Sequence, residues 1–475
     1  MSNLAATSRE GKPIEVDVKH VDALRAALRG SLHLAGSPGY DTSRTLWNGM
    51  IDRHPALVVR ALGVADVVTV VNFARQHGIA LSMKGGGHNI AGLACCDGGL
   101  LLDMGAMRGV WVDPAGRIAH AQGGCLLGDV DRETQLHGLA APLGFVSLTG
   151  IAGLTLGGGF GYMSRQCGWT SDSVRSMTLV TAEGKIVRAS EKENKDLFWG
   201  LRGGGGNFGV VTNIEYSLYP VGPEIVGGAV AWRGESAVEV MELFRKSAAA
   251  APEDLTLVLI LRLAPPAPWI DKDVHGKPVA IIIGCHTGKV ADGEKLLAPI
   301  KGFGKPVGDV MQRRPYVTQQ SLLDATQPNG RRYYWKSEYV SGFEPEVFAK
   351  LKEHGDKIVS PHSAAILFQL GGAIGRLPNS HSAVGNRGTG GLFNITAAWD
   401  NAADDAKNID WARNAWKDLK QFSTGGTYVN FLNADEAGDR IQDAFGGNMK
   451  RLGEVKQAWD PDNLFRVNKN IAPAK

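Results

Sequence analysis

The stretch Met83-Lys84-Gly85-Gly86-Gly87-His88-Asn89-Ile90-Ala91-Gly92 decides how this chain is interpreted. A β-like run, Ile79 to Ser82, leads into three consecutive glycines, which free the backbone from the steric limits of a Cβ atom. Successive backbone N–H groups in such a loop can cradle anionic oxygens, and Lys84 adds a positive charge at its start. His88 is the one reactive side chain inside the loop. The pattern favours a phosphate-bearing cofactor held close to an imidazole, and an ordinary glycine turn with a chance histidine is the alternative.

The composition is that of a globular protein with more than one domain. The chain has 475 residues, of which 44% are hydrophobic and 21% charged. Its 51 basic and 48 acidic residues give a formal net charge of +3, so a nucleic acid or an anionic membrane surface is not expected as a partner. No apolar run is long enough to span a bilayer, and the first residues lack an apolar signal-peptide core. Five cysteines without a CxxC pair favour the reducing cytoplasm.

The first half of the chain alternates between strand and helix patterns. A buried-strand run at 56–60 precedes an amphipathic helix over Val64–Gly78, and the strand and loop described above follow. This β-α-β order predicts a small α/β unit. Further strands are expected at 98–103 and 118–125, a helix at 126–137, and a second glycine block from Gly150 to Gly161 holds six glycines in twelve residues. Close packing against a flat ligand is one reason for such a block.

A third glycine block contains the pattern GxGxxG at Gly204, Gly206 and Gly209. In a dinucleotide-binding Rossmann unit this pattern follows a strand and opens a helix. Here a helix-like stretch precedes it and a strand, Val210 to Tyr219, follows. A Rossmann fold is therefore excluded on context.

The order of strand-like and helix-like runs changes after a linker at Pro220-Val221-Gly222-Pro223. Strand-like runs lie at 225–232, 256–264, 279–285, 332–340, 364–370, 392–399 and 427–432. Helix-like runs lie at 235–250, 345–359, 407–422 and 436–459. This arrangement favours an antiparallel sheet with helices on one face.

Four blocks, in one order from about Trp47 to Ile471, resemble the berberine-bridge-enzyme-like FAD-linked oxidases of bacterial type, within the vanillyl-alcohol-oxidase (PCMH-type) flavoprotein superfamily. The blocks are Lys84 to Asn89, Leu154 to Gly159, Arg202 to Thr212 and Asp460 to Arg466. The resemblance implies an α+β fold, with an FAD-binding domain of two α/β subdomains and a substrate domain with a large antiparallel sheet flanked by helices. The FAD domain would comprise 1–222 and 437–475, and the substrate domain 223–436.

The resemblance also implies how FAD is held. In the family the histidine of the GGH loop is joined to the flavin 8α-methyl carbon, and His88 occupies that position. Many members add a cysteinyl link from a G-x-C-P-T segment, where this chain has Val146, so attachment through His88 only is expected. Cys167 is twenty-one positions further on and is expected to pack in the core. The predicted cofactor-binding residues are Lys84, Gly85, Gly86, Gly87, His88, Asn89, Ile90, Thr149, Gly150, Gly153, Leu154, Gly158, Gly159, Gly161, Gly209, Val211, Asn468 and Asn470.

The substrate side departs from the family pattern. Alcohol-oxidising members often carry a tyrosine base in a Y-x-N-Y sequence, and this chain has Tyr428-Val429-Asn430-Phe431, in which Phe431 cannot accept a proton. A neutral amine substrate would need no base, because hydride can leave a carbon beside a nitrogen lone pair. The predicted catalytic residues are Tyr334, Lys336, Gln369, Tyr428 and Asn430. By alternation, Tyr334 and Lys336 should share one sheet face, as should Tyr428 and Asn430.

The leading hypothesis is an FAD-dependent oxidase that accepts hydride from a C–H next to oxygen or nitrogen of a small molecule, with O2 reoxidising the flavin to give H2O2. Thr149, expected beside the flavin's oxygen-reactive carbon, is compatible with oxygen access. The alternatives are a dehydrogenase that uses another electron acceptor and a flavin-binding protein without turnover. No metal site is expected, because the histidines show no paired ligand spacing.

Overall fold

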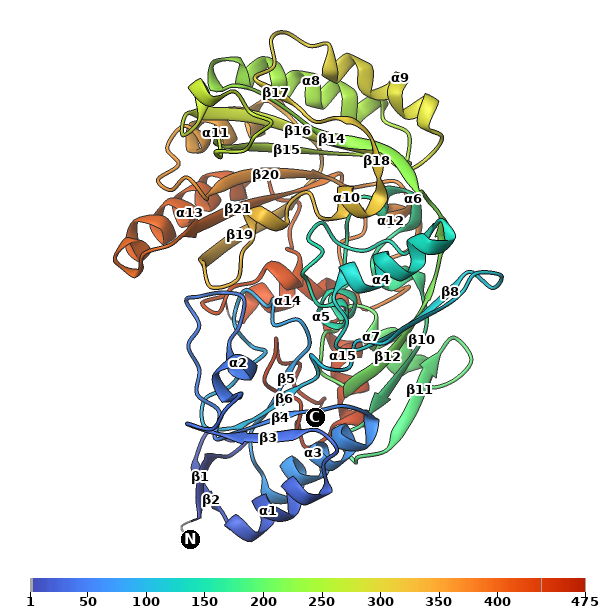
Figure 1. Ribbon diagram of the computed structural model, residues 1–475, viewed down its shortest axis with the longest axis vertical. Helices are drawn as coiled ribbons and strands as arrows, with labels where there is room; N and C mark the ends of the chain where they lie inside the picture. The colour runs from blue at the N-terminus through green and yellow to red at the C-terminus, as the bar shows by residue number, and fades with distance from the viewer. Residues whose placement is uncertain (1–2, 437, 475) are drawn as a thin grey trace.

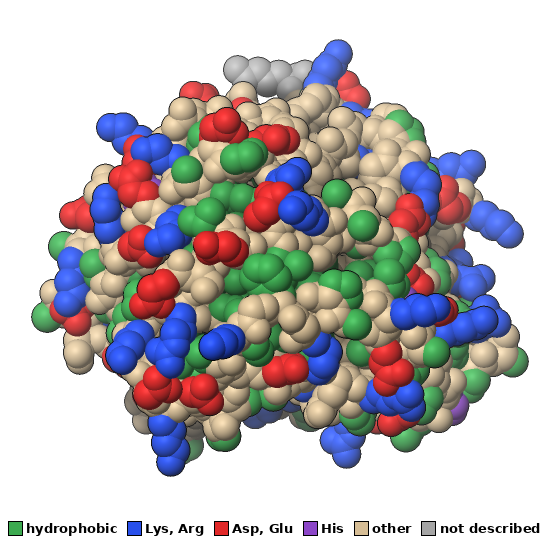
Figure 2. Space-filling model, turned by 90° about the horizontal axis from the view of Figure 1, so that it is seen from above, with side chains coloured by type: hydrophobic (Ala, Val, Ile, Leu, Met, Phe, Trp, Pro, Cys, Tyr) green, Lys and Arg blue, Asp and Glu red, His purple; other side chains and the backbone are tan. Residues whose placement is uncertain are grey.

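The computed structural model describes residues 3–436 and 438–474 and contains three principal sheets (Figure 1). Both ends of the chain lie in the lower half of Figure 1, and the largest sheet forms the upper half. The described part of the chain contains no helix that is long and apolar enough to cross a membrane. Seen from above, lysines and arginines are intermixed with acidic side chains over the surface (Figure 2), as the near-balanced net charge predicts.

The first sheet is a mixed four-stranded sheet in the N-terminal part. Its strands, in order, are β3 (Ser31–Leu34), β4 (Leu57–Arg60), β6 (Leu100–Asp103) and β5 (Leu81–Lys84). Strands β4 and β5 run parallel to β6, because α3 (Val64–His77) provides the crossover between them. This helix buries Val67, Val70, Val71 and Ala74, and ends at Gly78, whose φ is 63°. The predicted helix and β-α-β unit are confirmed. The remaining N-terminal elements are β1 (Leu4–Thr7), β2 (Pro13–Val16), α1 (Val18–Ala27) and α2 (Tyr40–Arg44).

The second sheet has five antiparallel strands. In order they are β11 (Ile186–Ser190), β10 (Val174–Val180), β12 (Val210–Ser217), β8 (Ile118–Gln122) and β7 (Val110–Asp113). The helices of this part are α4 (Leu127–Thr134), α5 (Ile151–Leu156), α6 (Ser164–Cys167) and α7 (Lys195–Leu201), and a short pair joins β9 (Leu139–Ala140) to β13 (Tyr219–Pro220). Helix α7 precedes the GxGxxG pattern and β12 follows it, which is the order that excluded a Rossmann unit.

The third sheet is antiparallel, with eight strands. The path is β17 (Gly308–Asp309), β14 (Glu224–Arg233), β16 (Pro278–His286), β15 (Leu255–Leu263), β20 (Ala364–Gln369), β21 (Gly391–Trp399) and β19 (Arg332–Val340), and β18 (Gln312–Pro315) pairs with β14. One face packs on α8 (Ala237–Ala250), α9 (Val290–Lys301), α11 (Pro345–Gly355) and α13 (Asp405–Leu419). The other face packs toward Phe160, Tyr162 and Trp169 of the N-terminal part. Because both faces are covered, most residues of these strands are buried, including polar ones such as Lys336 and Glu338 of β19. The predicted antiparallel sheet with helices on one face is confirmed.

Three predicted elements differ from the structure. The segment 427–432 is not a strand but contains a 3-10 turn, η8 (Val429–Phe431). The side chains of Tyr428 and Asn430 bond to the backbone of Gly159 and Leu154, and within the described residues the segment pairs with no neighbouring strand. The predicted helix 436–459, whose residue 437 lies outside the described residues, divides into α14 (Asp439–Phe445) and α15 (Met449–Trp459). Gly446, at φ 54°, interrupts it. Residues 123–125 likewise leave the strand β8 and form a turn. The other short helices are α10 (Tyr316–Gln320) and α12 (Ala373–Arg376).

The C-terminal segment packs on the N-terminal part of the chain. Leu464 and Phe465 join the core of the first sheet, and Leu452 and Ile471 join the core of the second. A fully buried ion pair between Lys456 and Asp460, at 2.6 Å, holds the turn after α15. These contacts support the proposed division into 1–222 with 437–475 and 223–436, of which residues 1–2, 437 and 475 lie outside the described residues.

Candidate functional site

A cavity of about 300 Å³ lies where the glycine-rich loops of the N-terminal part meet the large sheet. Twelve of the predicted cofactor-binding residues line it: Gly85, Gly86, Gly87, His88, Asn89, Thr149, Gly150, Gly153, Leu154, Gly209, Val211 and Asn468. These residues come from four segments that are far apart in the sequence: 85–89, 149–154, 209–211 and the tail at Asn468. The fold therefore brings the separate glycine blocks together around one volume.

The glycines of this cavity serve two purposes. A Cβ at Gly153 would meet nothing within 4 Å, and one at Gly206 would meet only Met83, at 3.6 Å, so side chains there would project into the cavity. Gly86 and Gly150 instead pack backbone against backbone, since a Cβ on Gly86 would lie 2.5 Å from the Gly150 nitrogen. The first group leaves room for a ligand against bare backbone, and the second group closes the wall.

His88 is held at the cavity by a stack of three rings. Its imidazole lies parallel to Trp47, with centroids 4.2 Å apart, and Trp47 stacks on Tyr333 of β19 at 3.8 Å. The preceding Gly87 has a φ of 68°. Burial lowers the pKa of His88 to about 3, so the ring is neutral at pH 7. Its Nε2 has no hydrogen-bond partner among the described residues, and the ring faces the cavity.

Other polar atoms of the lining are buried without a partner among the described residues. They are Asn468 Oδ1, Asn394 Oδ1, Trp335 Nε1 and Gln327 Oε1. Buried polar groups are normally hydrogen-bonded, so unpaired atoms around one cavity indicate that a polar ligand belongs there. The bare glycine backbone, the neutral imidazole and these unpaired atoms fit a flat cofactor with a phosphate-bearing tail.

Lys84 does not face this cavity, contrary to expectation. Its ammonium donates to the backbone oxygen of Ser43 and lies 3.4 Å from the carboxylate of Asp103. It lines a separate small polar pocket on the other side of Gly85 and Gly86. Because Asp103 is buried at the end of β6, the lysine is needed there as its counter-charge.

Five more predicted cofactor residues lie behind the lining. A Cβ on Gly159 would lie 2.5 Å from Thr170, and one on Gly161 would lie 1.8 Å from the Leu143 oxygen, so these glycines permit close packing. Gly158 similarly packs on Val384. Ile90 packs on Trp47, and Asn470 lies outside the lining, although its Oδ1 is also unpaired among the described residues.

The sheet contributes a wall of residues that sequence reasoning missed. The wall residues are Trp335 from β19, Ile366 and Phe368 from β20, and Asn394 and Thr396 from β21. They alternate along their strands, so they project from one face. This wall is mainly aromatic and aliphatic, with two neutral polar side chains.

Tyr334, Lys336 and Gln369 project from the opposite face, so their prediction as residues that cover the cofactor is wrong. The Tyr334 hydroxyl donates to Asp435 at 2.7 Å, and Lys336 lies 3.3 Å from Glu436. Gln369 bonds to the backbone of Leu257 and Ala248. Alternation correctly placed Tyr334 and Lys336 on a common face, but that face packs on the helices.

Tyr428 and Asn430 do line the cavity, although no strand carries them. The Tyr428 hydroxyl accepts hydrogen bonds from Gly159 N at 3.0 Å and from Asn430 Nδ2 at 2.8 Å. Burial raises the pKa of Tyr428 well above its usual value, so the hydroxyl keeps its proton at pH 7. Phe431 lines the same region and adds only apolar surface.

The positions relevant to a second flavin link are separated in space. Val146 lines the cavity, where a cysteine at the same position would face a ligand. Cys167 packs on the apolar cluster between the N-terminal part and the large sheet, and burial raises its thiol pKa to about 12. Its sulfur is therefore a poor nucleophile, and Cys167 is not among the lining residues.

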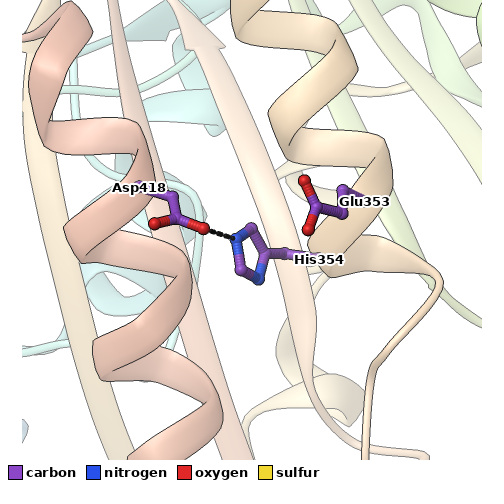
Figure 3. A group of neighbouring side chains, drawn as sticks. All are labelled: Glu353, His354 and Asp418. Carbon is purple, nitrogen blue, oxygen red and sulfur yellow. Dashed lines mark hydrogen bonds and ion pairs between the residues drawn. The ribbon is translucent and has the colours of Figure 1, made fainter.

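One group of side chains has the composition of a metal site. Glu353 and His354 on α11 and Asp418 on α13 bring donor atoms within 4.8 Å of one another (Figure 3). His354 Nε2 lies 2.9 Å from Asp418 Oδ2, and Glu353 is bound by Lys350 and Lys357, at 2.9 Å each. The donor atoms are thus engaged with one another or with lysines, and we interpret the group as an inter-helix polar contact.

Comparison with known proteins identifies this architecture. A family model described as FAD binding domain matches residues 55–190, and one described as berberine and berberine like matches residues 427–472. The chain is thus a homologue of the berberine-bridge-enzyme-like FAD-linked oxidoreductases, with relatives that align over nearly its whole length. It is therefore an enzyme that uses FAD, and the predicted α+β fold of this family is confirmed.

Three relatives illustrate this family. (R)-6-hydroxynicotine oxidase of Paenarthrobacter nicotinovorans is 29% identical over 459 residues, which are 94% of this chain and 97% of the relative. Chitooligosaccharide oxidase of Gibberella zeae is 27% identical and covers 92% of this chain and 91% of its own. The crystal structure of 6-hydroxy-D-nicotine oxidase from Arthrobacter nicotinovorans superposes with a TM-score of 0.84 at 26% identity, covering 94% of this chain and 98% of that chain.

Proposed function

We propose that this FAD-linked oxidoreductase is an oxidase that takes hydride from a C–H next to nitrogen in a small, largely apolar amine. The cavity wall that the large sheet forms carries the argument. Trp335, Ile366 and Phe368 offer apolar contacts, and Asn394 and Thr396 offer neutral hydrogen bonds. The described residues of this wall include no carboxylate and no histidine that could take a proton from an alcohol.

The chain's own groups bind and orient in this proposal. Bound FAD supplies the two-electron acceptor chemistry, and O2 returns it to the oxidised state with release of H2O2. Tyr428 keeps its proton and, together with Asn430, fixes the wall through the backbone of residues 154–159. The aromatic wall excludes water and favours the neutral amine, whose nitrogen lone pair assists departure of the hydride. Asn394 has a free acceptor oxygen with which to orient the substrate.

The proposal includes attachment of FAD through His88 only. The neutral imidazole has a lone pair, and the stack on Trp47 and Tyr333 fixes the ring at the cavity. Val146 and Cys167 offer no second attachment, for the reasons given above. The cytoplasmic location stays a prediction, supported by five cysteines that are all free.

A substrate panel tests the reaction class. Purified holoenzyme is mixed anaerobically with neutral amines, secondary alcohols and sugars, and the flavin absorbance is followed. We expect bleaching by amines that include an aromatic ring, consistent with the relative named (R)-6-hydroxynicotine oxidase. Bleaching by sugars or alcohols alone would contradict the amine assignment.

A second measurement separates oxidase from dehydrogenase. The flavin is photoreduced without oxygen, air is admitted, and absorbance and H2O2 are recorded. We expect the oxidised spectrum to return within seconds with one H2O2 per flavin, because Thr149 lines the cavity and its small side chain is compatible with oxygen access. Return over many minutes would favour a dehydrogenase with another acceptor.

A further inference from the structure

Lys469 is the only side chain of the cavity lining, within the described residues, that carries a full charge at pH 7. The lining contains no aspartate, glutamate or arginine, and His88 is neutral there. FAD carries two negative charges on its pyrophosphate. The positive charge of Lys84, which the sequence suggested for this role, instead pairs with Asp103 on the other side of the loop. A cofactor with a dianionic tail thus meets a single cation, and that cation is on the C-terminal tail.

The tail fixes Lys469 beside the glycine-rich loop of residues 204–207. Asn207 Nδ2 donates to the Lys469 carbonyl at 3.2 Å, and Asn468 Nδ2 donates to the Gly206 oxygen at 3.1 Å. Gly205 and Gly206 in this loop face open space, with no atom closer than 3.6 Å to a Cβ at either position. The backbone at Lys469 is therefore fixed beside bare glycine backbone that a phosphate can approach, and its side chain, which belongs to the lining of the same cavity, extends to the Asn433 oxygen.

The ammonium of Lys469 has hydrogen-bonding capacity to spare. Nζ donates to the Asn433 oxygen at 2.6 Å, which uses one of its three N–H groups. Within the described residues it forms no ion pair with a carboxylate. The nearby carboxylates are already engaged, since Glu436 lies 3.3 Å from both Lys336 and Arg440, and Asp435 lies 2.8 Å from Arg413. A half-buried lysine with two free donors beside a cavity suits an anionic ligand.

We propose that Lys469 is the counter-ion of the cofactor's pyrophosphate and takes the role that the sequence suggested for Lys84. An ammonium binds phosphate as a compact point charge with charge-assisted hydrogen bonds. This proposal rests on FAD as the cofactor and is independent of the substrate and of the oxidant.

The protonation state of Lys469 is consistent with this role. Burial lowers its pKa to about 8, while Glu436 and Asp435 act in the opposite direction and Lys336 adds to the lowering. The ammonium is therefore mostly charged at pH 7, and a bound phosphate raises its pKa again.

The test uses the full chain with a His88→Ala background, in which FAD is held without a covalent bond. The rate of FAD release from holoprotein on dilution is followed by flavin fluorescence for Lys469, Lys469→Met and Lys469→Arg. We expect Lys469→Met to release FAD at least about tenfold faster, as for loss of one charge-assisted hydrogen bond. Lys469→Arg should stay within about threefold of the parent. Lys301→Met, which removes a lysine of α9 that pairs with Asp309 and lies outside the lining, is the control and should release FAD at the parent rate.

A second readout places the charge on the cofactor. In the His88-containing protein, the midpoint potential of the flavin is compared between Lys469 and Lys469→Met. A pyrophosphate counter-ion leaves the potential unchanged. Equal release rates in all variants, or a potential that falls in Lys469→Met, would overturn the assignment, the latter by moving the charge to the flavin ring. If Lys469→Met does not fold, Lys469→Gln supplies the same comparison.

Discussion

Single residues around the cavity differ in what they contribute, and His88 is the one whose chemistry is most specific. Its ring is neutral, stacked on Trp47 and free at Nε2 within the described residues. Position 146, where many family members carry the second attachment cysteine, is a valine, and Cys167 is partly buried outside the cavity lining. The covalent attachment therefore depends on this one imidazole.

The first prediction concerns that bond. Acid-denatured wild-type protein should keep its yellow colour on the chain, and His88→Ala should release FAD on denaturation, because the lining within the described residues contains no cysteine and no second histidine. Absorbance of the precipitate and supernatant, with peptide mapping, measures this. Cys167→Ala is the control and should retain the flavin; flavin mapped to Cys167 would refute the prediction.

The second prediction concerns two asparagines of the cavity lining, Asn394 of the sheet wall and Asn430 of the segment 427–432. Asn394→Ala and Asn430→Ala should retain FAD but slow its anaerobic reduction by substrate by about tenfold to a hundredfold, as expected for loss of one or two orienting hydrogen bonds. Stopped-flow absorbance measures the rate. Lys336→Met, on the opposite face of the sheet, should lower the melting temperature but leave this rate within about twofold. Parent-like rates in both asparagine variants would show that the wall does not orient the substrate.

At the scale of elements, the contact between α4 and α10 supports the cavity wall from behind. Gln320 of α10 donates both to Asp131 of α4, at 3.1 Å, and to the Gly144 oxygen of the wall, at 3.2 Å. Asp131 is fully buried, and its second oxygen has no partner among the described residues. Burial, with the nearby charge of Asp324, raises the pKa of Asp131 to about 7. This inter-element contact is therefore sensitive to pH.

The third prediction follows from the sign of that shift. The unfolded chain loses the Asp131 proton near pH 4 and the folded chain near pH 7, so the stability present below pH 4 declines as pH rises to 7. The free energy of unfolding of Asp131→Asn should rise relative to that of wild type between pH 4.5 and 8, by on the order of 4 kcal/mol at most. Melting temperatures across this range measure the difference. Gln320→Leu keeps the titrating carboxyl and should keep the pH dependence; a constant difference between Asp131→Asn and wild type would contradict the argument.

At the scale of the whole molecule, Asn48 joins the cofactor loop to the large sheet. Its Nδ2 donates to the oxygens of Ile90 and Tyr333, at 3.0 Å each, and its Oδ1 accepts from Tyr333 N at 3.0 Å. Tyr333 and Asn48 are 285 positions apart in the sequence. This side chain therefore holds β19 against the loop that carries His88.

The fourth prediction is that Asn48→Ala loosens this junction. Loss of these bonds should cost about 2 to 4 kcal/mol and lower the melting temperature by several degrees. The fraction of chains with covalently bound flavin should also fall, because the stack that orients His88 rests on Tyr333. Denaturing gels scanned for flavin fluorescence measure the attachment. Asn408→Ala, equally buried but bonded to the Asp404 oxygen just before α13, should lower stability without lowering the flavin content.

The sequence by itself determined the elements and the cofactor loops. The strand Leu255–Leu263 and the helix α3 follow from local patterns, a long apolar run and a helical periodicity. Clustered glycines indicate where the backbone approaches another segment or a ligand closely. The order of the glycine blocks was sufficient for the family and its fold. The segment 427–432 escaped this reasoning because its polar side chains bond across the cavity to residues 154–159 rather than within a strand.

Only the tertiary structure decided which side of each element faces the cofactor. Alternation places Tyr334 with Lys336 and Tyr333 with Trp335, but both faces of the sheet are buried, so the pattern does not tell which pair meets the cavity. The ion pairs of Lys336 and Lys84 with distant carboxylates turned both lysines away. Lys469 was left facing the cavity because the carboxylates near it are already paired. Such choices depend on compensating buried charge across residues far apart in sequence, and that information exists only after folding.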